Sequence, residues 1–367
     1  MQPVHGYRRG MDLSPVPGAG EVRQEDAFDV SAAVGRLRSQ VDPALAVELA
    51  GEPEVRQFTG GASNLTYLLR YPHRDLILRR PPSGQKARGA HDMRREFTIQ
   101  SRLRPVYPYV PRMVALCQDE SVIGSEFYVM ERVEGTILGR DLPPDLDLSD
   151  EQVRRLCTGV LDRLVELHSV DAERAGLGDL GKGQGYVARQ VAGWSERFRR
   201  ARTDDVGDFE TVMAWLEAHR PDDVASCVIH NDYRFDNVVL DGDLEVAAVL
   251  DWEMATLGDP LMDLGGALAY WVQADDDEVF AQFRRQPTHV PGMLTRAEVV
   301  AYYTDRMGIT VTPERWTFYE VFGLFRVAVI AQQIYYRYFH GQTTNEAFAI
   351  FGPAVGYLEQ RCKERIG

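Results

Sequence analysis

The stretch His230–Asn237, which reads HNDYRFDN, decides how the rest of this sequence is interpreted. It lies between two short apolar runs, CVIH before it and VVLD after it. Short runs rich in valine and isoleucine predict strands, so the polar segment between them is expected to be a loop at strand ends. A polar β-turn with capping side chains would look similar, and the neighbouring sequence has to separate these two interpretations.

The spacing H-x-D-x4-N of His230, Asp232 and Asn237 matches the catalytic loop of kinases. In that arrangement Asp232 would accept or orient the proton of the attacking hydroxyl. Asn237 would bind magnesium through its amide oxygen, and His230 would brace the loop. In phosphoryl transfer the protein contributes little covalent chemistry. Most of the rate acceleration comes from positioning the reactants and neutralising the phosphate charge.

A second motif supports this interpretation. The strand-like run VAAVLD ends at Asp251, fourteen residues past Asn237, and Trp252-Glu253 follows it. Kinases place a metal-binding aspartate at this distance from the loop. Magnesium prefers a few hard oxygen ligands completed by water and phosphate, and Asn237 with Asp251 would supply such a pair. A helix N-cap after a strand is the alternative for Asp251.

The run HNDYRFDN…VLDWEMATLGDPLMDLG resembles the aminoglycoside phosphotransferase family, the small-molecule branch of the kinase-like fold. More narrowly, it is similar to the group related to the kinase-like domains fused to some acyl-CoA dehydrogenases. The resemblance covers about residues 30–360. It implies ATP and magnesium as cofactors and an alcohol group as acceptor. It also implies that Asp259 and Asp263 support the loop or the metal site; a cap and a helix-start acid are the alternative.

The order of the predicted elements fits a bilobal α+β protein of the kinase-like class. Strands are predicted before and after one helix, and the chain becomes mostly helical after Gly135, beginning with a capping box at Ser149 and Gln152. We therefore expect a mobile tail over 1–26, a small β-rich N-lobe over 27–130 and a larger, mainly helical C-lobe over 131–367. The predicted N-lobe elements are Val55–Thr59, Leu65–Tyr71, Leu76–Arg80, the helix His91–Arg104, Arg112–Cys117 and Glu126–Met130.

The N-lobe holds the candidate phosphate-binding residues. The turn with Gly60, Gly61, Ser63 and Asn64 would let the backbone approach phosphate closely, although a plain hairpin turn would look similar. The resemblance places a lysine on the strand Leu76–Arg80, where this chain has Arg79. Arginine also binds phosphate, but its shape differs from that of lysine.

Glu96, on the following helix, is the expected ion-pair partner of Arg79. Two solvated surface charges are the alternative, because exposed pairs contribute little. The hinge after the last N-lobe strand contains Met130, Glu131 and Val133. The resemblance implies that their backbone groups bind the adenine edge.

Composition restricts the partners. The chain has 367 residues, a net charge of −14 and a pI of about 5.1. This charge argues against nucleic acid and anionic membranes, which need a basic face. No apolar run reaches the length of about 18 residues that a membrane span needs. The four cysteines are far apart in the sequence, which favours a reducing cytoplasm over a disulfide framework.

The acceptor is the least constrained partner. The narrower resemblance favours a small-molecule hydroxyl on a hydroxy acid or hydroxyacyl-CoA, whose anionic groups could meet the arginines of 197–202 and Arg337. Aminoglycosides are the alternative acceptors, with the acidic run 275–278 as their candidate site. A nucleotide-binding pseudokinase or regulatory protein is an alternative of another class, supported by Arg79. Aromatic residues could line an acyl pocket or belong to the core: Tyr302, Tyr303, Trp316, Phe318, Tyr319, Tyr335 and Tyr336.

Overall fold

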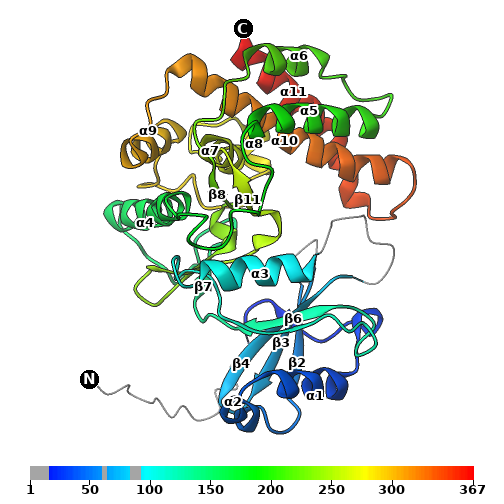
Figure 1. Cartoon of the computed structure of the whole chain (residues 1–367). Coiled ribbons are helices and arrows are strands. Elements are labelled where there is room, and N and C mark those ends of the chain that lie inside the picture. Colours follow the sequence, from blue (N-terminus) through cyan, green and yellow to red (C-terminus); the bar gives the residue numbers. More distant parts are fainter. Residues whose placement is uncertain (1–15, 60–63, 83–91) are drawn as a thin grey trace. The chain divides into compact units, whose positions relative to one another are not determined.

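The computed structural model describes residues 16–59, 64–82 and 92–367. The chain divides into two compact units, Met1–Glu134 and Gly135–Gly367 (Figure 1). The division lies slightly beyond the predicted boundary at residue 130, because local contacts hold the next residues to the first unit. The Glu131 N–H donates to the Arg112 carbonyl at 2.9 Å, and Arg132 forms a salt bridge with Asp75 at 2.8 Å.

The first unit is built on one antiparallel sheet with the strand order β1-β2-β3-β4-β6-β5. Both faces of its central strands are buried. One face, with Tyr67 and Leu69, packs with Leu37 of α1; the other, with Leu68 and Ile77, packs with Met93 of α3. The elements are β1 Ala19–Gly20, α1 Val30–Gln40, α2 Pro43–Glu48, β2 Glu54–Phe58, β3 Leu65–Tyr71, β4 Arg74–Arg80, α3 Met93–Leu103, β5 Met113–Cys117 and β6 Phe127–Glu131.

The prediction of a mobile tail over 1–26 is wrong for its described part, residues 16–26. Strand β1 pairs with β2, and the buried Asp26 accepts a hydrogen bond from Gln57 at 2.8 Å. Arg80 also donates to the Asp26 carbonyl at 2.6 Å. These are long-range polar contacts, which leave no apolar periodicity in the sequence. Residues 1–15 lie outside the described part of the chain.

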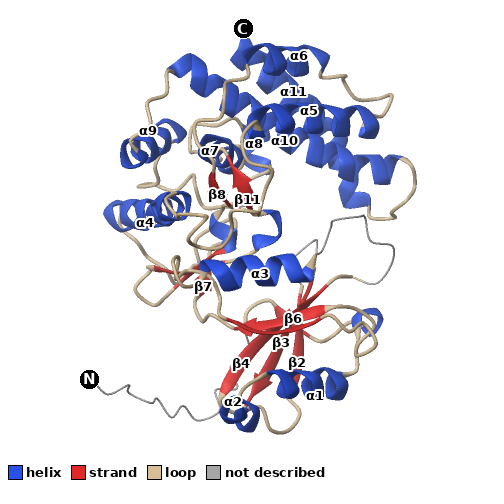
Figure 2. Cartoon of the chain, in the orientation of Figure 1, coloured by secondary structure: helices blue, strands red, loops and turns tan. Residues whose placement is uncertain are grey.

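The second unit is mainly helical and has a few short strands, among them β8 and β11 (Figure 2). The long helix α10 packs against α5, α7 and α11. The strands form the sheets β10-β9-β7 and β11-β8. Helices are α4 Asp150–His168, α5 Tyr186–Ala201, α6 Glu210–His219, α7 Pro260–Leu268, α8 Glu278–Gln282, α9 Arg296–Met307, α10 Pro313–Phe339 and α11 Phe351–Ile366. Strands are β7 Thr136–Ile137, β8 Cys227–Ile229, β9 Val238–Leu240, β10 Val246–Val249 and β11 Thr256–Gly258.

Local signals explain how this unit begins. The predicted capping box forms at the start of α4: the Ser149 N–H donates to Gln152 at 2.9 Å, and the Ser149 side chain accepts from the Gln152 N–H. Gly135 has φ 150°, and a Cβ there would lie 2.2 Å from the Leu240 carbonyl oxygen, so a side chain would clash with β9. No helix among the described residues is both long and apolar enough to span a membrane.

Candidate active site

Strand pairing brings the two predicted chemical motifs together in the second unit. The loop His230–Asn237 follows β8, and its last three residues form a short 3-10 helix, η2, that leads directly into β9. Strand β10 pairs with β9, and the pairing continues one residue further because the Leu250 N–H donates to the Asn237 carbonyl at 2.8 Å. Asp251 follows Leu250 directly. It therefore lies at the same end of the β9–β10 pair as Asn237.

Asp232 is held at one carboxylate oxygen. The Asn237 Nδ2 donates to Asp232 Oδ2 at 3.0 Å and to the Asp232 carbonyl at 2.8 Å, while Arg234 lies 3.2 Å from the same Oδ2. The side chain is 25% exposed. Its second oxygen, Oδ1, forms no hydrogen bond with a described residue. This carboxylate is therefore fixed in position, and its Oδ1 can still accept a hydrogen bond.

The residues expected to hold magnesium suit that ion. Because Asn237 uses its Nδ2 on Asp232, its amide oxygen is left without a hydrogen bond to a described residue. Asp251 has a left-handed backbone (φ 66°, ψ 62°), and its side chain does not cap the 3-10 helix η3 (Trp252–Met254). The cap interpretation of Asp251 is therefore wrong. Within the described residues there is no cluster of three His, Cys, Asp or Glu side chains for a metal cage. Two oxygen groups that phosphate and water complete are a common magnesium arrangement.

A buried network supports the loop from behind. Asp263, on α7, accepts from the backbone N–H groups of His230 and Asn231, both at 2.7 Å. It also accepts from His168 Nε2 at 3.1 Å, and the other ring nitrogen of His168 contacts the Tyr303 hydroxyl at 2.5 Å. All these side chains except that of Asn231 are buried. Asp263 therefore fixes the backbone of the residues that precede Asp232.

Asp259 and Asp263 differ in their surroundings. Burial would raise the pKa of Asp263, but hydrogen bonds and charge from His168 and His230 outweigh it, so the pKa is lowered. Asp259 caps α7 by accepting from the Leu261 and Met262 N–H groups, and burial raises its pKa despite these bonds. The predicted alternative of a helix cap thus describes Asp259, whereas Asp263 contacts the loop 230–237.

His230 is inside the protein and has both ring nitrogens engaged. Nε2 donates to the Leu250 carbonyl at 2.9 Å, and Nδ1 accepts from the Asp232 N–H at 3.2 Å. The ring also packs edge-on against Trp252, with 4.8 Å between the ring centroids. The side chain has 0% exposure. His230 therefore joins the loop to the end of β10, and we treat it as a positioning residue.

In the first unit, Arg79 and Glu96 form a buried ion pair with 3.3 Å between Nη1 and Oε2. Tyr128 donates to the same Oε2 at 2.8 Å, and Asn64 donates to Oε1 at 2.9 Å. Glu96 is 1% exposed, which excludes the alternative of two solvated surface charges. The network fixes Arg79 and Asn64 relative to each other. The predicted Gly60, Gly61 and Ser63 lie outside the described residues.

The predicted adenine-binding residues lie at the end of β6. Met130 and Glu131 belong to the strand, and Glu131 is fixed by a salt bridge with Arg74 at 2.8 Å. Val133 follows the strand, and neither its N–H nor its carbonyl bonds to any residue that the structure describes. One donor and one acceptor are thus available there for the edge of a planar base.

Comparison with known proteins settles the family. The model of the phosphotransferase enzyme family (APH) matches residues 54–299. The chain belongs to this family. Acyl-CoA dehydrogenase family member 10 of Mus musculus is 35% identical to this phosphotransferase over 332 residues, covering 90% of the chain and 30% of that protein. Family member 11 of Gallus gallus is 31% identical over 350 residues, covering 94% and 44%. The phosphotransferase spans less than half the length of these two curated relatives.

Solved structures agree. A candidate aminoglycoside phosphotransferase from Ralstonia eutropha JMP134 matches with a TM-score of 0.76 and 30% identity, covering 92% of this chain and 98% of that one. A choline kinase from Cryptosporidium parvum matches at a TM-score of 0.60 and 11% identity, covering 92% and 96%, which shows the fold alone. The predicted family and the α+β, kinase-like fold are confirmed.

Several side chains proposed for acceptor binding have structural partners in this phosphotransferase. Within the acidic run 275–278, Asp276 pairs with Arg296 and Arg361, each at 2.5 Å, and Asp277 accepts from Tyr357 at 2.6 Å. Burial opposes ionisation of Asp276, but these partners outweigh it and lower its pKa. Asp276 and Asp277 therefore have arginine partners within the fold, whereas the exposed Asp275 and Glu278 form no ion pair with a described residue.

Of the arginine cluster, Arg199 pairs with Glu210 and Arg200 with Glu196, whereas Arg197 stacks on Trp194. Tyr303, Phe318 and Tyr319 belong to the buried core. Sequence reasoning missed His168 and the hydrogen bond that it makes to Asp263. The available signal was a histidine at the end of the apolar stripe of α4, where a polar side chain needs a partner.

Proposed function

We propose that this phosphotransferase transfers the γ-phosphoryl group of ATP to the hydroxyl of a small molecule, a hydroxy acid or hydroxyacyl-CoA. The observation that carries the proposal is the Asp232 carboxylate, fixed at Oδ2 by Asn237 and open at Oδ1. A carboxylate held in this way can orient an attacking hydroxyl and accept its proton.

The other predicted residues then take these roles. Asn237 and Asp251 would hold magnesium, which neutralises phosphate charge when bound. Arg79, oriented by Glu96, would contact phosphate together with Asn64 and the turn of Gly60, Gly61 and Ser63. Backbone groups at Met130, Glu131 and Val133 would bind adenine. His230 and Asp263 hold the loop, and Asp259 holds the start of α7.

The acceptor class has two supports. The similar proteins named acyl-CoA dehydrogenase family members suggest an acceptor linked to acyl-CoA chemistry. Arg296 and Arg361 also neutralise part of the acidic run 275–278, the candidate site for a polycation, which disfavours the aminoglycoside alternative. We place the protein in the cytoplasm, because all four cysteines are buried, unpaired thiols.

A pseudokinase that binds nucleotide without turnover is the alternative of another class. Arg79 at the lysine position favours it. The full set of Asp232, Asn237 and Asp251 favours turnover, since a protein that only binds nucleotide does not need an open carboxylate beside the loop.

Magnesium-dependent ATP hydrolysis separates these functions. We expect slow hydrolysis in the unaltered protein and a fall of about 100-fold or more in Asp232→Ala, the scale of a lost general base. Asp251→Ala should give a similar fall and a higher magnesium requirement. Asp243→Ala, at an exposed aspartate outside the loop, is the matched control. Hydrolysis that is the same in both active-site variants as in the control would refute the enzyme proposal.

A further inference from the structure

A pocket of about 410 Å³ opens beside the catalytic loop, entirely within the second unit. Four of its lining residues are cations, namely Lys182, Arg189, Arg197 and Arg326, and none is acidic. The whole chain carries 55 acidic and only 41 basic side chains. A cavity that gathers four cations and no carboxylate is therefore opposite in charge to the molecule around it.

The partners of these cations leave their charge uncompensated. Arg189 donates to the carbonyls of Gly183 and Gln184, and the Arg197 guanidinium lies 4.6 Å from the centre of the Trp194 ring. Carbonyl groups and an aromatic face carry no net charge. Among the described residues, no carboxylate lies within salt-bridge distance of any of the four cations. A positive potential of this kind attracts anions.

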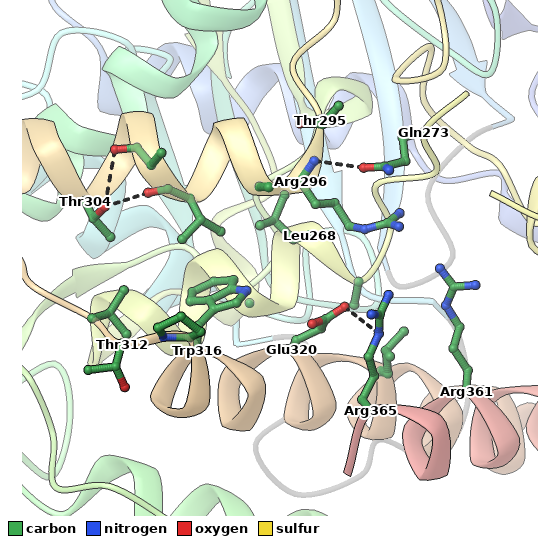
Figure 3. Close-up of a pocket in the computed structure, with 18 of the residues that line it drawn as sticks. Leu268, Gln273, Thr295, Arg296, Thr304, Thr312, Trp316, Glu320, Arg361 and Arg365 are labelled. Atoms are coloured by element: carbon green, nitrogen blue, oxygen red, sulfur yellow. Dashed lines mark hydrogen bonds and ion pairs between the residues drawn. The ribbon is translucent and has the colours of Figure 1, made fainter. Parts of the chain in front are cut away.

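Another cavity of the second unit also gathers arginines, but there carboxylates neutralise them. It measures about 710 Å³ and also has three arginines in its wall (Figure 3). There, however, Arg365 pairs with Glu320 at 3.1 Å, while Arg296 and Arg361 share Asp276. None of residues 230–237 is among its lining residues. The neutralised cavity is thus away from the loop, and the cationic pocket is the one next to it.

Arg326 links the pocket to the loop and has an unused donor. Its Nη2 donates to the Asn231 carbonyl at 2.6 Å, and its guanidinium lies 5.4 Å from the centre of the Trp194 ring. Its Nε is buried and has no hydrogen-bond partner. Buried donors in native proteins are nearly always satisfied, so this Nε is expected to bond to water or to a bound ligand.

Asn231 brings the pocket within one residue of Asp232. It lines the pocket, and its side chain accepts from the Tyr186 hydroxyl at 3.0 Å and donates to the Met254 carbonyl at 3.1 Å. The wall of the pocket is therefore continuous with the backbone that presents the open carboxylate. A ligand seated on the cations would contact Asn231, the residue directly before Asp232.

We infer that this pocket binds an anionic group, carboxylate or phosphate, of the acceptor whose hydroxyl faces Asp232. The inference rests on the proposed function and makes it more specific: the acceptor is an anion. Guanidinium groups suit both oxyanions, and the guanidinium groups of Arg197 and Arg326 both lie near the Trp194 ring, which also lines the pocket. A polycation such as an aminoglycoside would be repelled by the same four charges.

The first test compares acceptors that differ in charge. ADP release is measured with a medium-chain hydroxy acid, its coenzyme A thioester, the corresponding neutral diol and kanamycin. We expect either or both anions to exceed the diol by about tenfold or more in kcat/KM, with an advantage that shrinks as salt rises. Preference for the free acid points to a carboxylate in the pocket, and preference for the thioester points to phosphate. Equal turnover of the diol, or better turnover of kanamycin, would overturn the inference.

The second test changes the pocket. The double variant Lys182→Gln/Arg197→Gln alters two exposed side chains and should lower the ratio of anion to diol kcat/KM by about tenfold, since charge-assisted contacts are lost. Arg200→Gln lies on the same helix outside the pocket and should leave that ratio unchanged. An unaltered ratio in the double variant would reject the pocket as the anion site.

A binding measurement covers the case in which none of these acceptors reacts. Titration calorimetry with coenzyme A and with the hydroxy acid should show binding that weakens in the double variant and remains in Arg200→Gln. No difference between the two variants, or no binding of either anion, would overturn the inference. Loss of magnesium-dependent ATP hydrolysis in Asp232→Ala is scored separately. Absence of this hydrolysis in the unaltered protein would refute the proposed function. Hydrolysis that is present, with no preference for anionic acceptors, would refute only this inference.

Discussion

Replacing Asp263 with asparagine should destabilise the second unit and distort the catalytic loop. The Asp263 carboxylate accepts at Oδ2 from the His230 N–H and from His168, and at Oδ1 from the Asn231 N–H. Asparagine has one acceptor and one donor at these positions. Its best orientation keeps the oxygen on the two-donor side, so its NH2 group faces the Asn231 N–H. That N–H loses its partner, and the two remaining bonds change from a charged to a neutral acceptor.

The expected cost follows from these contacts. An unsatisfied buried N–H costs about 1–3 kcal/mol, and neutral hydrogen bonds are roughly half as strong as charge-assisted ones. Together they give a loss of about 2–4 kcal/mol. For a domain of 150–250 residues this lowers Tm by roughly 5–15 °C. ATP hydrolysis should fall as well, because the backbone before Asp232 is no longer fixed.

The pH dependence of Tm tests the same reasoning, because the pKa shifts of Asp263 and Asp259 have opposite directions and predict opposite trends. The pKa of Asp263 is lowered in the folded protein, so its contribution is complete above the unfolded pKa of about 4 and is lost as the pH falls through the folded pKa. The Tm difference between the parent and Asp263→Asn should therefore shrink below about pH 4. At Asp259 the folded pKa is raised, so the difference between the parent and Asp259→Asn should grow in acid.

Thermal unfolding followed by circular dichroism, from pH 7.5 down to the lowest pH at which the protein stays folded, measures both variants. Equal Tm values for the parent and Asp263→Asn at pH 7.5 would refute the proposed role of the carboxylate. So would two variants whose differences from the parent change with pH in the same direction, because opposite pKa shifts require opposite trends.

Three further variants test separate parts of the fold. Arg79→Ala leaves Glu96 buried without its cation and should cost the first unit about 3–5 kcal/mol in urea unfolding. Gly135→Ala should destabilise the second unit by about 2 kcal/mol or more in the same assay, because the new Cβ would lie 2.2 Å from the Leu240 carbonyl oxygen. Ser149→Ala removes the cap of α4 and should cost about 1 kcal/mol, seen as a small decrease in Tm.

Each of these variants has a conservative counterpart. Arg79→Lys keeps the charge and should recover most of the stability that Arg79→Ala loses, and an equal loss in both would mean that the charge is unimportant. Gly139→Ala, where a Cβ meets nothing within 4 Å, should change stability far less than Gly135→Ala. Ser149→Thr retains the capping hydroxyl, so a loss as large as that of Ser149→Ala would contradict the role of the cap.

Local sequence signals were enough for much of the fold. Alternating apolar residues predicted β3 and β4 within a residue or two, and the capping box placed the start of α4. The pairing of β1 could not be predicted, because Ala19 and Gly20 have no strand signature and are held by a partner far along the chain. Long-range polar contacts of this kind are set by tertiary structure and leave no period in the sequence.

In the candidate site, too, local spacing was predictable from the sequence and long-range contacts were not. Spacing alone singled out Asp232, Asn237 and Asp251, because Asn237 directly precedes β9 and Asp251 closely follows β10, and these two strands pair at fixed register. The link from Tyr303 through His168 to Asp263 joins three helices, and no spacing rule predicts it. The cationic pocket combines residues from separate segments in the same way, so the sequence offered only an arginine cluster, of which one member lines the pocket.

The loop 230–237 contacts buried side chains on one side and the exposed residues of the cationic pocket on the other. This difference affects how such a protein can evolve. On its buried side, Asp263 and His168 are core residues, and their replacement is expected to destabilise the fold enough for selection on stability to remove it. On the pocket side, Lys182 and Arg197 are exposed, so their replacement is expected to change the free energy of unfolding very little. If the pocket binds the acceptor as proposed, substrate preference can change through surface mutations that the fold tolerates, while the residues of the loop stay the same.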